Sequence, residues 1–117
     1  MTYTPDYPTF VESRLKDGGA ILKDMTPEKA DLIHLAMLIS GEAGEILDAI
    51  KKHVIYNKPL DIENLDEECG DILFGITALL RRIGRSEDGC KARNVEKLMK
   101  RYATGYSDRA AQERADK

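Results

Sequence analysis

The sequence predicts an all-α protein, folded as an antiparallel four-helix-type bundle that oligomerisation completes. Two long segments carry apolar residues at steps of three and four, which is the spacing of one helix face. No segment alternates apolar and polar residues over the length of a strand. The connections between the expected helices are short, and short connections favour antiparallel neighbours. The 117 residues are enough for one domain and too few for two ordinary ones.

The composition narrows the class of protein. Apolar residues make up 42% and charged residues 33% of the chain, a balance typical of globular proteins. The longest stretches without a charged side chain are Leu32–Gly41 and Ile72–Leu80, well short of the roughly 20 apolar residues that span a bilayer. Cys69 and Cys90 form neither a disulfide framework nor a zinc cluster, and the N-terminus lacks the pattern of a secretory signal. We therefore expect a cytoplasmic protein without a membrane partner.

Two helices are predicted in the first half of the chain. A short one is expected over Thr9–Lys16, ended by Gly18-Gly19. Thr26 can cap the N-terminus of the second, because its hydroxyl can accept a hydrogen bond from a free backbone N–H. Pro27 then occupies the first helical position, where its fixed φ is favourable. This helix is expected to run to about Val54, shortly before an Asn-Lys-Pro sequence that ends it.

Two more helices are predicted in the second half. Asn64 can cap a helix that runs to Ile83 and ends at Gly84. Ser86 can cap the next one, which is expected to reach about Tyr102. We assign residues 1–117 to one domain in which residues 1–25 and the tail 103–117 are peripheral. The tail has helix-forming composition but little apolar surface, so we expect it to fray or to dock on a partner.

Some apolar side chains lie off the centres of the two long apolar stripes. They are Met37, Leu47, Leu73 and Phe74. A second buried face on each helix would explain them, which predicts self-association as a dimer or tetramer. The alternative is a monomeric four-helix bundle with a few exposed apolar residues.

A short repeat links the two long helices. Residues 42–47 and 68–73 share the pattern Glu-x-Gly-acid-Ile-Leu. At about 100° per residue, each helix carries an acidic pair at positions i and i+3 on the same side of its apolar stripe. The pairs are Glu42 with Glu45 and Glu68 with Asp71. If the two helices pack together, the four carboxylates converge beside the core.

Four carboxylates gathered beside a core repel one another unless a cation compensates. Oxygen ligands favour magnesium or manganese, and such sites also hold the phosphates of a nucleotide. A di-iron site needs a histidine three residues after a glutamate, and neither His34 nor His53 has that spacing. Gly44 and Gly70 face away from the carboxylates, and we interpret them as points of close helix approach. The alternative is that the acidic residues are ordinary solvated positions.

These motifs resemble those of a known family. Glu42-x-x-Glu45, followed after 22 residues by Glu68-x-x-Asp71, is similar to the signature of the MazG-like all-α nucleoside triphosphate pyrophosphatases. Residues 94–102 resemble that family's C-terminal segment, Asn-x-x-Lys-Leu-x-x-Arg-Tyr. The resemblance covers about Leu32–Ser107, which is most of the chain.

The resemblance implies hydrolysis of a nucleoside triphosphate between its α- and β-phosphates, which gives a nucleoside monophosphate and pyrophosphate. It implies a deoxynucleotide as the substrate and Mg²⁺ as the cofactor, with Mn²⁺ able to substitute. The catalytic and metal-holding carboxylates would be Glu42, Glu45, Glu68 and Asp71. The phosphate contacts from the last long helix would be Asn94, Lys97 and Arg101.

Two further polar residues lie along the carboxylate edge of the second predicted helix. Lys52 follows Glu45 by seven residues, about two turns, and is a candidate phosphate contact. The other interpretation of Lys52 is a cation that complements the C-terminal end of the helix dipole. His34, roughly two turns before Glu42, can reach a nucleobase or sugar. The N-terminal aromatic residues can stack on a base or fill a partner's groove: Tyr3, Tyr7 and Phe10.

A different class of function remains open, namely a non-catalytic helical dimerisation or adaptor module whose acidic surface binds a basic partner. The matching register of the two acidic pairs favours the enzyme, because an adaptor does not need four carboxylates beside one core. Nucleic-acid binding through the basic stretch Lys91–Arg101 is disfavoured, since the acidic block Asp61–Asp71 would repel a phosphate backbone.

Overall fold

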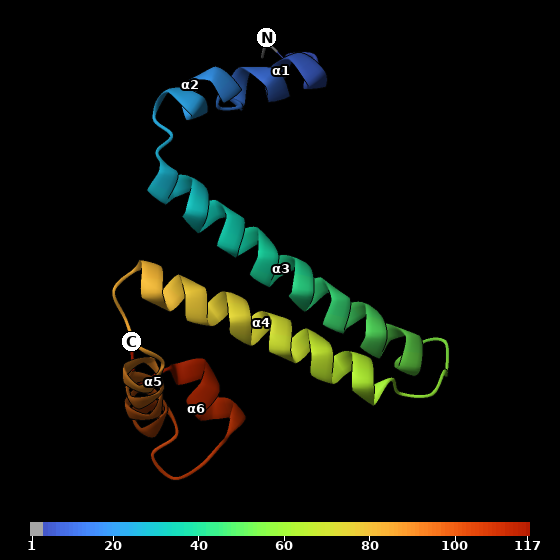
Figure 1. Ribbon diagram of the computed structural model, residues 1–117, viewed down its shortest axis with the longest axis vertical. Helices are drawn as coiled ribbons and strands as arrows, with labels where there is room; N and C mark the ends of the chain where they lie inside the picture. The colour runs from blue at the N-terminus through green and yellow to red at the C-terminus, as the bar shows by residue number, and fades with distance from the viewer. Residues whose placement is uncertain (1–3) are drawn as a thin grey trace. The chain divides into compact units, whose positions relative to one another are not determined.

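The computed structural model describes residues 4–117, and its regular elements are helices, with no β-strand in that range (Figure 1). The prediction of an all-α protein is confirmed. The chain divides into two compact units, one ending at Ile33 and the other spanning His34–Lys117, and each is described by itself. Tyr3 lies outside the described residues. None of the helices in residues 4–117 combines the length and apolar content needed to cross a bilayer.

The first unit contains α1 (Tyr7–Arg14), α2 (Gly18–Lys23) and the first turns of α3. α1 begins earlier than predicted, because the Asp6 side chain caps it by accepting a hydrogen bond from a first-turn N–H at 3.3 Å. The prediction that the two glycines at 18 and 19 end this helix is wrong, since they begin α2 instead. Asp17 makes this possible by capping α2 in the same way, again at 3.3 Å.

The two long helices are α3 (Pro27–Val54) and α4 (Ile62–Arg82). The predicted N-cap of α3 is confirmed, because the Thr26 hydroxyl accepts a hydrogen bond from a first-turn N–H at 3.1 Å. The predicted cap of α4 is wrong: Asp61 caps the helix by accepting a hydrogen bond from the Asn64 N–H at 3.1 Å. A carboxylate at this position is also stabilised by the positive end of the helix dipole, so α4 starts one turn early.

The chain continues through α5 (Glu87–Arg101) and α6 (Asp108–Glu113). Ser86 caps α5, as predicted. The expectation that the tail frays is wrong, because α6 contacts α5 within the same chain, and docking of the tail on a partner stays a prediction. The Arg101 guanidinium donates two hydrogen bonds to the Asp116 carboxylate, at 2.7 and 3.0 Å, and this pair fixes the tail.

From His34 onward, α3 runs side by side with α4 in the opposite direction (Figure 1). The two helices pack closely at Gly75, which is buried. A Cβ atom at this glycine would lie 2.8 Å from Cγ1 of Ile39 and 2.8 Å from Cδ2 of Leu38. A Cβ at Gly44 or Gly70 would meet nothing within 4 Å, so the interpretation of these two glycines as contact points is wrong within the chain.

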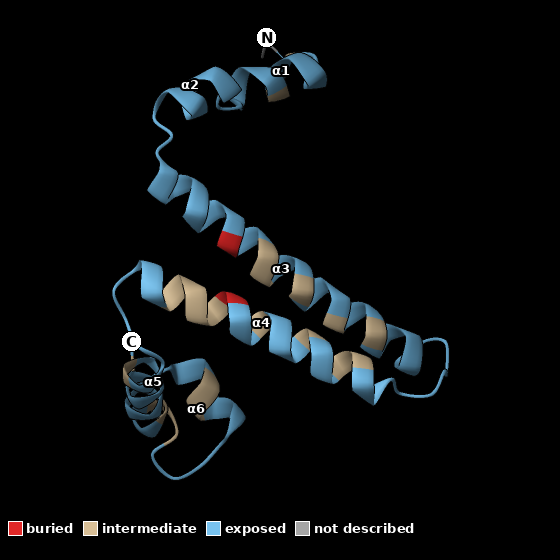
Figure 2. Cartoon of the chain, in the orientation of Figure 1, coloured by how far each residue is buried: buried red, intermediate tan, exposed pale blue. Residues whose placement is uncertain are grey.

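Burial is concentrated on the facing sides of α3 and α4 (Figure 2). Among the large apolar residues in 4–117, Leu35 alone is buried, and many others stay exposed. The exposed group includes the four residues predicted to form a second buried face: Met37, Leu47, Leu73 and Phe74. One chain thus provides a helical hairpin, while the closed bundle and its oligomerisation stay predictions.

Gly75→Ala tests the close approach of the two helices. We expect a net loss of stability, because forcing a methyl group into this contact costs about 1–3 kcal/mol, against about 0.5–1 kcal/mol gained in helix propensity. Gly70→Ala is the matched control: it lies on the same helix with open space around it, and it should raise the melting temperature. Thermal melts of both variants decide the point, and an equal rise in both would contradict the packing described here.

Candidate functional site

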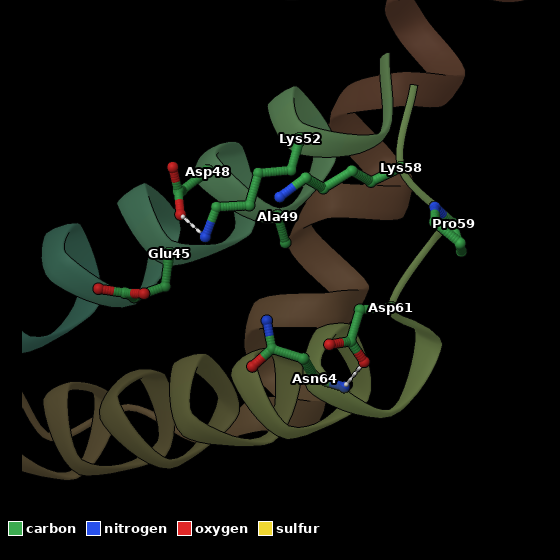
Figure 3. Close-up of a pocket in the computed structure, with 8 residues that line it drawn as sticks. All are labelled: Glu45, Asp48, Ala49, Lys52, Lys58, Pro59, Asp61 and Asn64. Atoms are coloured by element: carbon green, nitrogen blue, oxygen red, sulfur yellow. Dashed lines mark hydrogen bonds and ion pairs between the residues drawn. The ribbon is translucent and has the colours of Figure 1, made fainter. Parts of the chain in front are cut away.

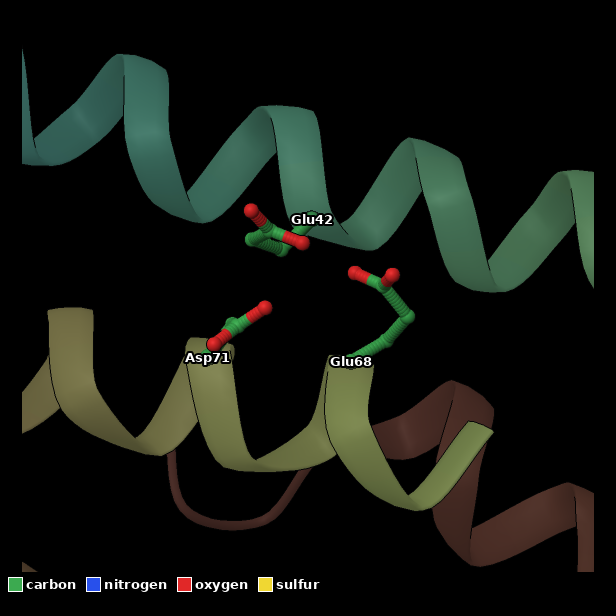
Figure 4. Close-up of side chains that lie close together, drawn as sticks. All are labelled: Glu42, Glu68 and Asp71. Atoms are coloured by element: carbon green, nitrogen blue, oxygen red, sulfur yellow. The ribbon is translucent and has the colours of Figure 1, made fainter. Parts of the chain in front are cut away.

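Two helices bring three of the four predicted carboxylates together. Glu42 projects from α3, while Glu68 and Asp71 project from α4, one turn apart on the same face (Figure 4). Each offers one oxygen atom, and these three atoms lie within 4.8 Å of one another. We call this group the carboxylate cluster. It follows directly from antiparallel packing, which places the middle of α3 opposite the middle of α4.

The electrostatics of the cluster are dominated by mutual repulsion. A hydrogen bond with the Glu42 carboxyl group, partial burial and the like charges of Glu42 and Asp71 raise the pKa of Glu68 to about 7. The second oxygen of Glu68, Oε2, is buried and has no hydrogen-bond partner among the described residues. A buried acceptor without a donor is costly, so this atom is suited to bind a cation or a proton donor.

The donor set fits one class of metal ion. It consists of oxygen atoms alone, which magnesium and manganese prefer, and the orphaned Oε2 of Glu68 supplies a free lone pair. Neither histidine belongs to the cluster: His34 is an exposed residue of α3, and His53 is engaged with the loop after that helix.

Glu45 does not join the carboxylate cluster. It is exposed on α3 one turn after Glu42, and its charge contributes to the raised pKa of Glu68. Its side chain faces a pocket of about 390 Å³, which we call the loop pocket (Figure 3). The lining residues come from α3, the following loop and the start of α4: Glu45, Asp48, Ala49, Lys52, Lys58, Pro59, Asp61 and Asn64.

The loop pocket is lined by charges of both signs, with two lysines set among the carboxylates of Glu45, Asp48 and Asp61. Lys52 forms an ion pair with Asp48, 2.9 Å between Nζ and Oδ2, and this contact raises the pKa of the Lys52 ammonium group. Lys58 reaches from the loop back toward α3 (Figure 3). Lys58 was not among the predicted site residues, because the Asn-Lys-Pro sequence around it was interpreted only as the end of a helix. Its position shortly after Lys52, in the short connection between two predicted helices, could have identified it.

The loop that carries Lys58 is held by specific contacts. The Lys58 backbone N–H donates to the Lys52 carbonyl at 3.2 Å, and the Lys58 carbonyl accepts a hydrogen bond from His53 Nδ1 at 2.7 Å. Asn57 makes the turn with a φ of +54°, a left-handed conformation that asparagine tolerates better than most residues. Lys58 is therefore placed by its backbone.

A second pocket lies on the other side of the carboxylate cluster. It has a volume of about 280 Å³ and is lined by Leu38, Glu42, Asp71 and Phe74. We call it the apolar pocket. Phe74 was expected only in a subunit contact, yet its side chain lines a cavity shared with two carboxylates of the cluster.

The predicted phosphate contacts on α5 lie apart from these two pockets, whose linings contain no α5 residue. Asn94 and Lys97 are exposed on that helix. Arg101 is engaged by Asp116, and the two side chains are only 14% and 3% exposed. This contact lowers the pKa of Asp116 to about 2.

Comparison with known proteins gives one match. The family model described as the MazG nucleotide pyrophosphohydrolase domain matches residues 30–105, well over half of the chain. No curated protein and no solved structure matches. The matched range contains the carboxylate cluster, both pockets beside it and α5. The resemblance noted from the acidic repeat is thereby confirmed, and the chain belongs to the MazG family of nucleotide pyrophosphohydrolase domains.

Proposed function

We propose that this protein hydrolyses a deoxynucleoside triphosphate between the α- and β-phosphates. Water adds to the α-phosphorus, the bond to the bridging oxygen breaks, and pyrophosphate leaves a nucleoside monophosphate behind. The observation that carries the proposal is the meeting of Glu42, Glu68 and Asp71 within 4.8 Å inside a MazG domain. Because nucleoside triphosphates are plentiful in the cytoplasm, we propose that location.

Pyrophosphohydrolases of this family generally depend on a divalent metal. We propose Mg²⁺, with Mn²⁺ able to substitute, held by the three residues of the carboxylate cluster and by Glu45. The ion would supply positive charge that stabilises the negative charge developing on the phosphate oxygens. The ion would also attract the phosphates of the substrate, and one of the carboxylates accepts the proton of the attacking water.

The other predicted residues keep their roles as proposals. Lys52 contacts phosphate from the loop pocket, and His34 contacts the base or sugar from the N-terminal side of the cluster. Asn94, Lys97 and Arg101 contact phosphate from α5. For Arg101, this requires that its guanidinium leave the Asp116 carboxylate.

We also propose that the active form is a dimer or tetramer. Met37, Leu47 and Leu73 are each at least 60% exposed, although a single chain would gain by burying them. A second copy of the same hairpin would cover them and complete the bundle.

The products of the reaction are the first test. With Mg²⁺ or Mn²⁺, a panel of nucleoside triphosphates should yield pyrophosphate and monophosphate from at least one member, and chelation should stop the reaction. Chromatography of the nucleotide products with separate assays for pyrophosphate and orthophosphate gives the answer. A diphosphate with orthophosphate would place the cleavage elsewhere.

Glu68→Gln tests the carboxylate cluster. With chelator at neutral pH, the variant should melt no lower than the parent, because one repulsive charge is gone. It should also respond less to Mg²⁺ and lose orders of magnitude in turnover, because a ligand has been removed. Asp66→Asn is the control, because Asp66 is an exposed acidic residue on the same helix. It should change the free energy of unfolding by about 0.5 kcal/mol or less and leave the response to Mg²⁺ intact.

The stability of the parent and that of Glu68→Gln should depend differently on pH when metal is chelated. Folded Glu68 keeps its proton up to a pKa of about 7, whereas the unfolded chain releases it near the ordinary value of 4.5. The folded parent thus binds more protons between these values, and its stability should fall relative to the variant as pH rises through this window. Equal Mg²⁺ stabilisation of parent and variant would mean that these carboxylates are not the metal site, and indifference of both proteins to Mg²⁺ would favour an adaptor.

Light scattering at micromolar concentration tests the assembly. The parent should have the mass of a dimer or tetramer, and Leu47→Asp should lower it, because a charge in an apolar interface is costly. Val95→Asp, on an exposed position of α5, should keep the parent's mass. A parent that has only the monomer mass would refute this part of the proposal.

A further inference from the structure

Three chemically different regions follow one another along the α3–α4 hairpin. Because the helices are antiparallel, Leu38 lies opposite the α4 residues that follow Asp71, and Lys52 lies opposite the start of α4. The apolar pocket therefore comes first, the carboxylate cluster lies in the middle (Figure 4), and the loop pocket lies at the closed end (Figure 3).

The apolar pocket offers two nonpolar side chains, Leu38 and Phe74, beside two carboxylates of the cluster. Phe74 lies about one turn after Asp71 on α4, and Leu38 about one turn before Glu42 on α3. The Phe74 side chain is 69% exposed, so its ring is accessible from the pocket. An aromatic ring stacks on the face of any nucleobase without reading its hydrogen-bonding edge. His34, one turn further along α3, adds a polar group on the same edge.

The loop pocket is lined mainly by charged side chains. Of its three carboxylates, Asp48 pairs with Lys52, Asp61 caps α4, and Glu45 is the one proposed to help hold the metal ion. Among the described residues no carboxylate pairs with the Lys58 ammonium group, and the hydrogen bonds of its backbone to His53 and Lys52 hold it at this end. A flexible ammonium group of this kind is suited to phosphate oxygens.

We infer that the nucleotide binds in one direction, with its base on Leu38 and Phe74 and its β- and γ-phosphates toward Lys52 and Lys58. The inference rests on the proposed function, because cleavage at the carboxylate cluster fixes the α-phosphate between the two pockets. The reverse direction would place the terminal phosphates against a phenyl ring, where their loss of hydration is uncompensated. Pyrophosphate then leaves through the loop pocket, and the monophosphate through the apolar pocket.

Phe74→Ala tests the base end. For the nucleoside triphosphate that the parent hydrolyses best, KM should rise about fivefold or more, because a stacking surface is lost. Inhibition by inorganic tripolyphosphate, which has no nucleoside, should stay within about twofold of the parent. Ile62→Ala is the matched control, since Ile62 is also 69% exposed on α4 but lines neither pocket, and it should leave both values unchanged.

Lys58→Gln tests the phosphate end and should show the reverse pattern. Inhibition by pyrophosphate should weaken about fivefold or more, because a charged hydrogen bond is lost. Inhibition by the nucleoside monophosphate should stay within about twofold. Lys51→Gln is its control, because Lys51 is a neighbouring exposed lysine that does not line the loop pocket.

The remaining outcomes separate the possible failures. A parent that hydrolyses no triphosphate overturns the proposed function and this inference together. If the parent is active and Phe74→Ala has the same KM, the inferred binding direction is wrong, while the proposed function still holds. The direction is also wrong if Phe74→Ala lowers the mass by light scattering and weakens the binding of all ligands equally. In that case a second copy of the chain occupies the apolar pocket. If Phe74→Ala weakens inhibition by pyrophosphate and Lys58→Gln does not, the nucleotide binds in the reverse direction.

Discussion

Repulsion between carboxylates held across the α3–α4 contact is the constraint on which the site depends. Glu42 can approach Glu68 and Asp71 only because the helices pack closely, and Gly75 permits that approach by presenting no side chain to Ile39. Packing free energy therefore opposes electrostatic repulsion at the centre of the hairpin. The folded chain tolerates this conflict, and under the proposed function a cation would relieve it without rearrangement, because the carboxylates already converge.

Local signals accounted for much of the fold. Thr26 with Pro27, and Ser86 before an acidic first turn, set helix boundaries through hydrogen bonds that involve only neighbouring residues, and both were predictable. The convergence of Glu42 with Glu68 was also predictable, because the acidic repeat holds the same register to the apolar stripe on both helices. Helix periodicity translates directly into a shared face.

The features that the sequence did not predict depend on a choice between equally suitable residues or on contacts between residues far apart in the chain. Asp61 and Asn64 are both acceptable caps, and only the loop geometry selects the earlier one. Four glycines lie within the two long helices, and only the packing of α3 against α4 singles out Gly75 as the close contact. The direction of Lys58 depends on a bond to His53 five residues away, which no periodic pattern encodes.

The Arg101–Asp116 pair makes the tail and the guanidinium one cooperative unit. The two side chains are 15 residues apart in sequence, and α6 lies between them. Releasing Arg101 therefore removes one of the contacts that hold the tail near α5, so that exposure of the guanidinium is coupled to loosening of the tail. Amide hydrogen exchange within α6 consequently reports on the opening of the tail, which the Arg101–Asp116 pair opposes.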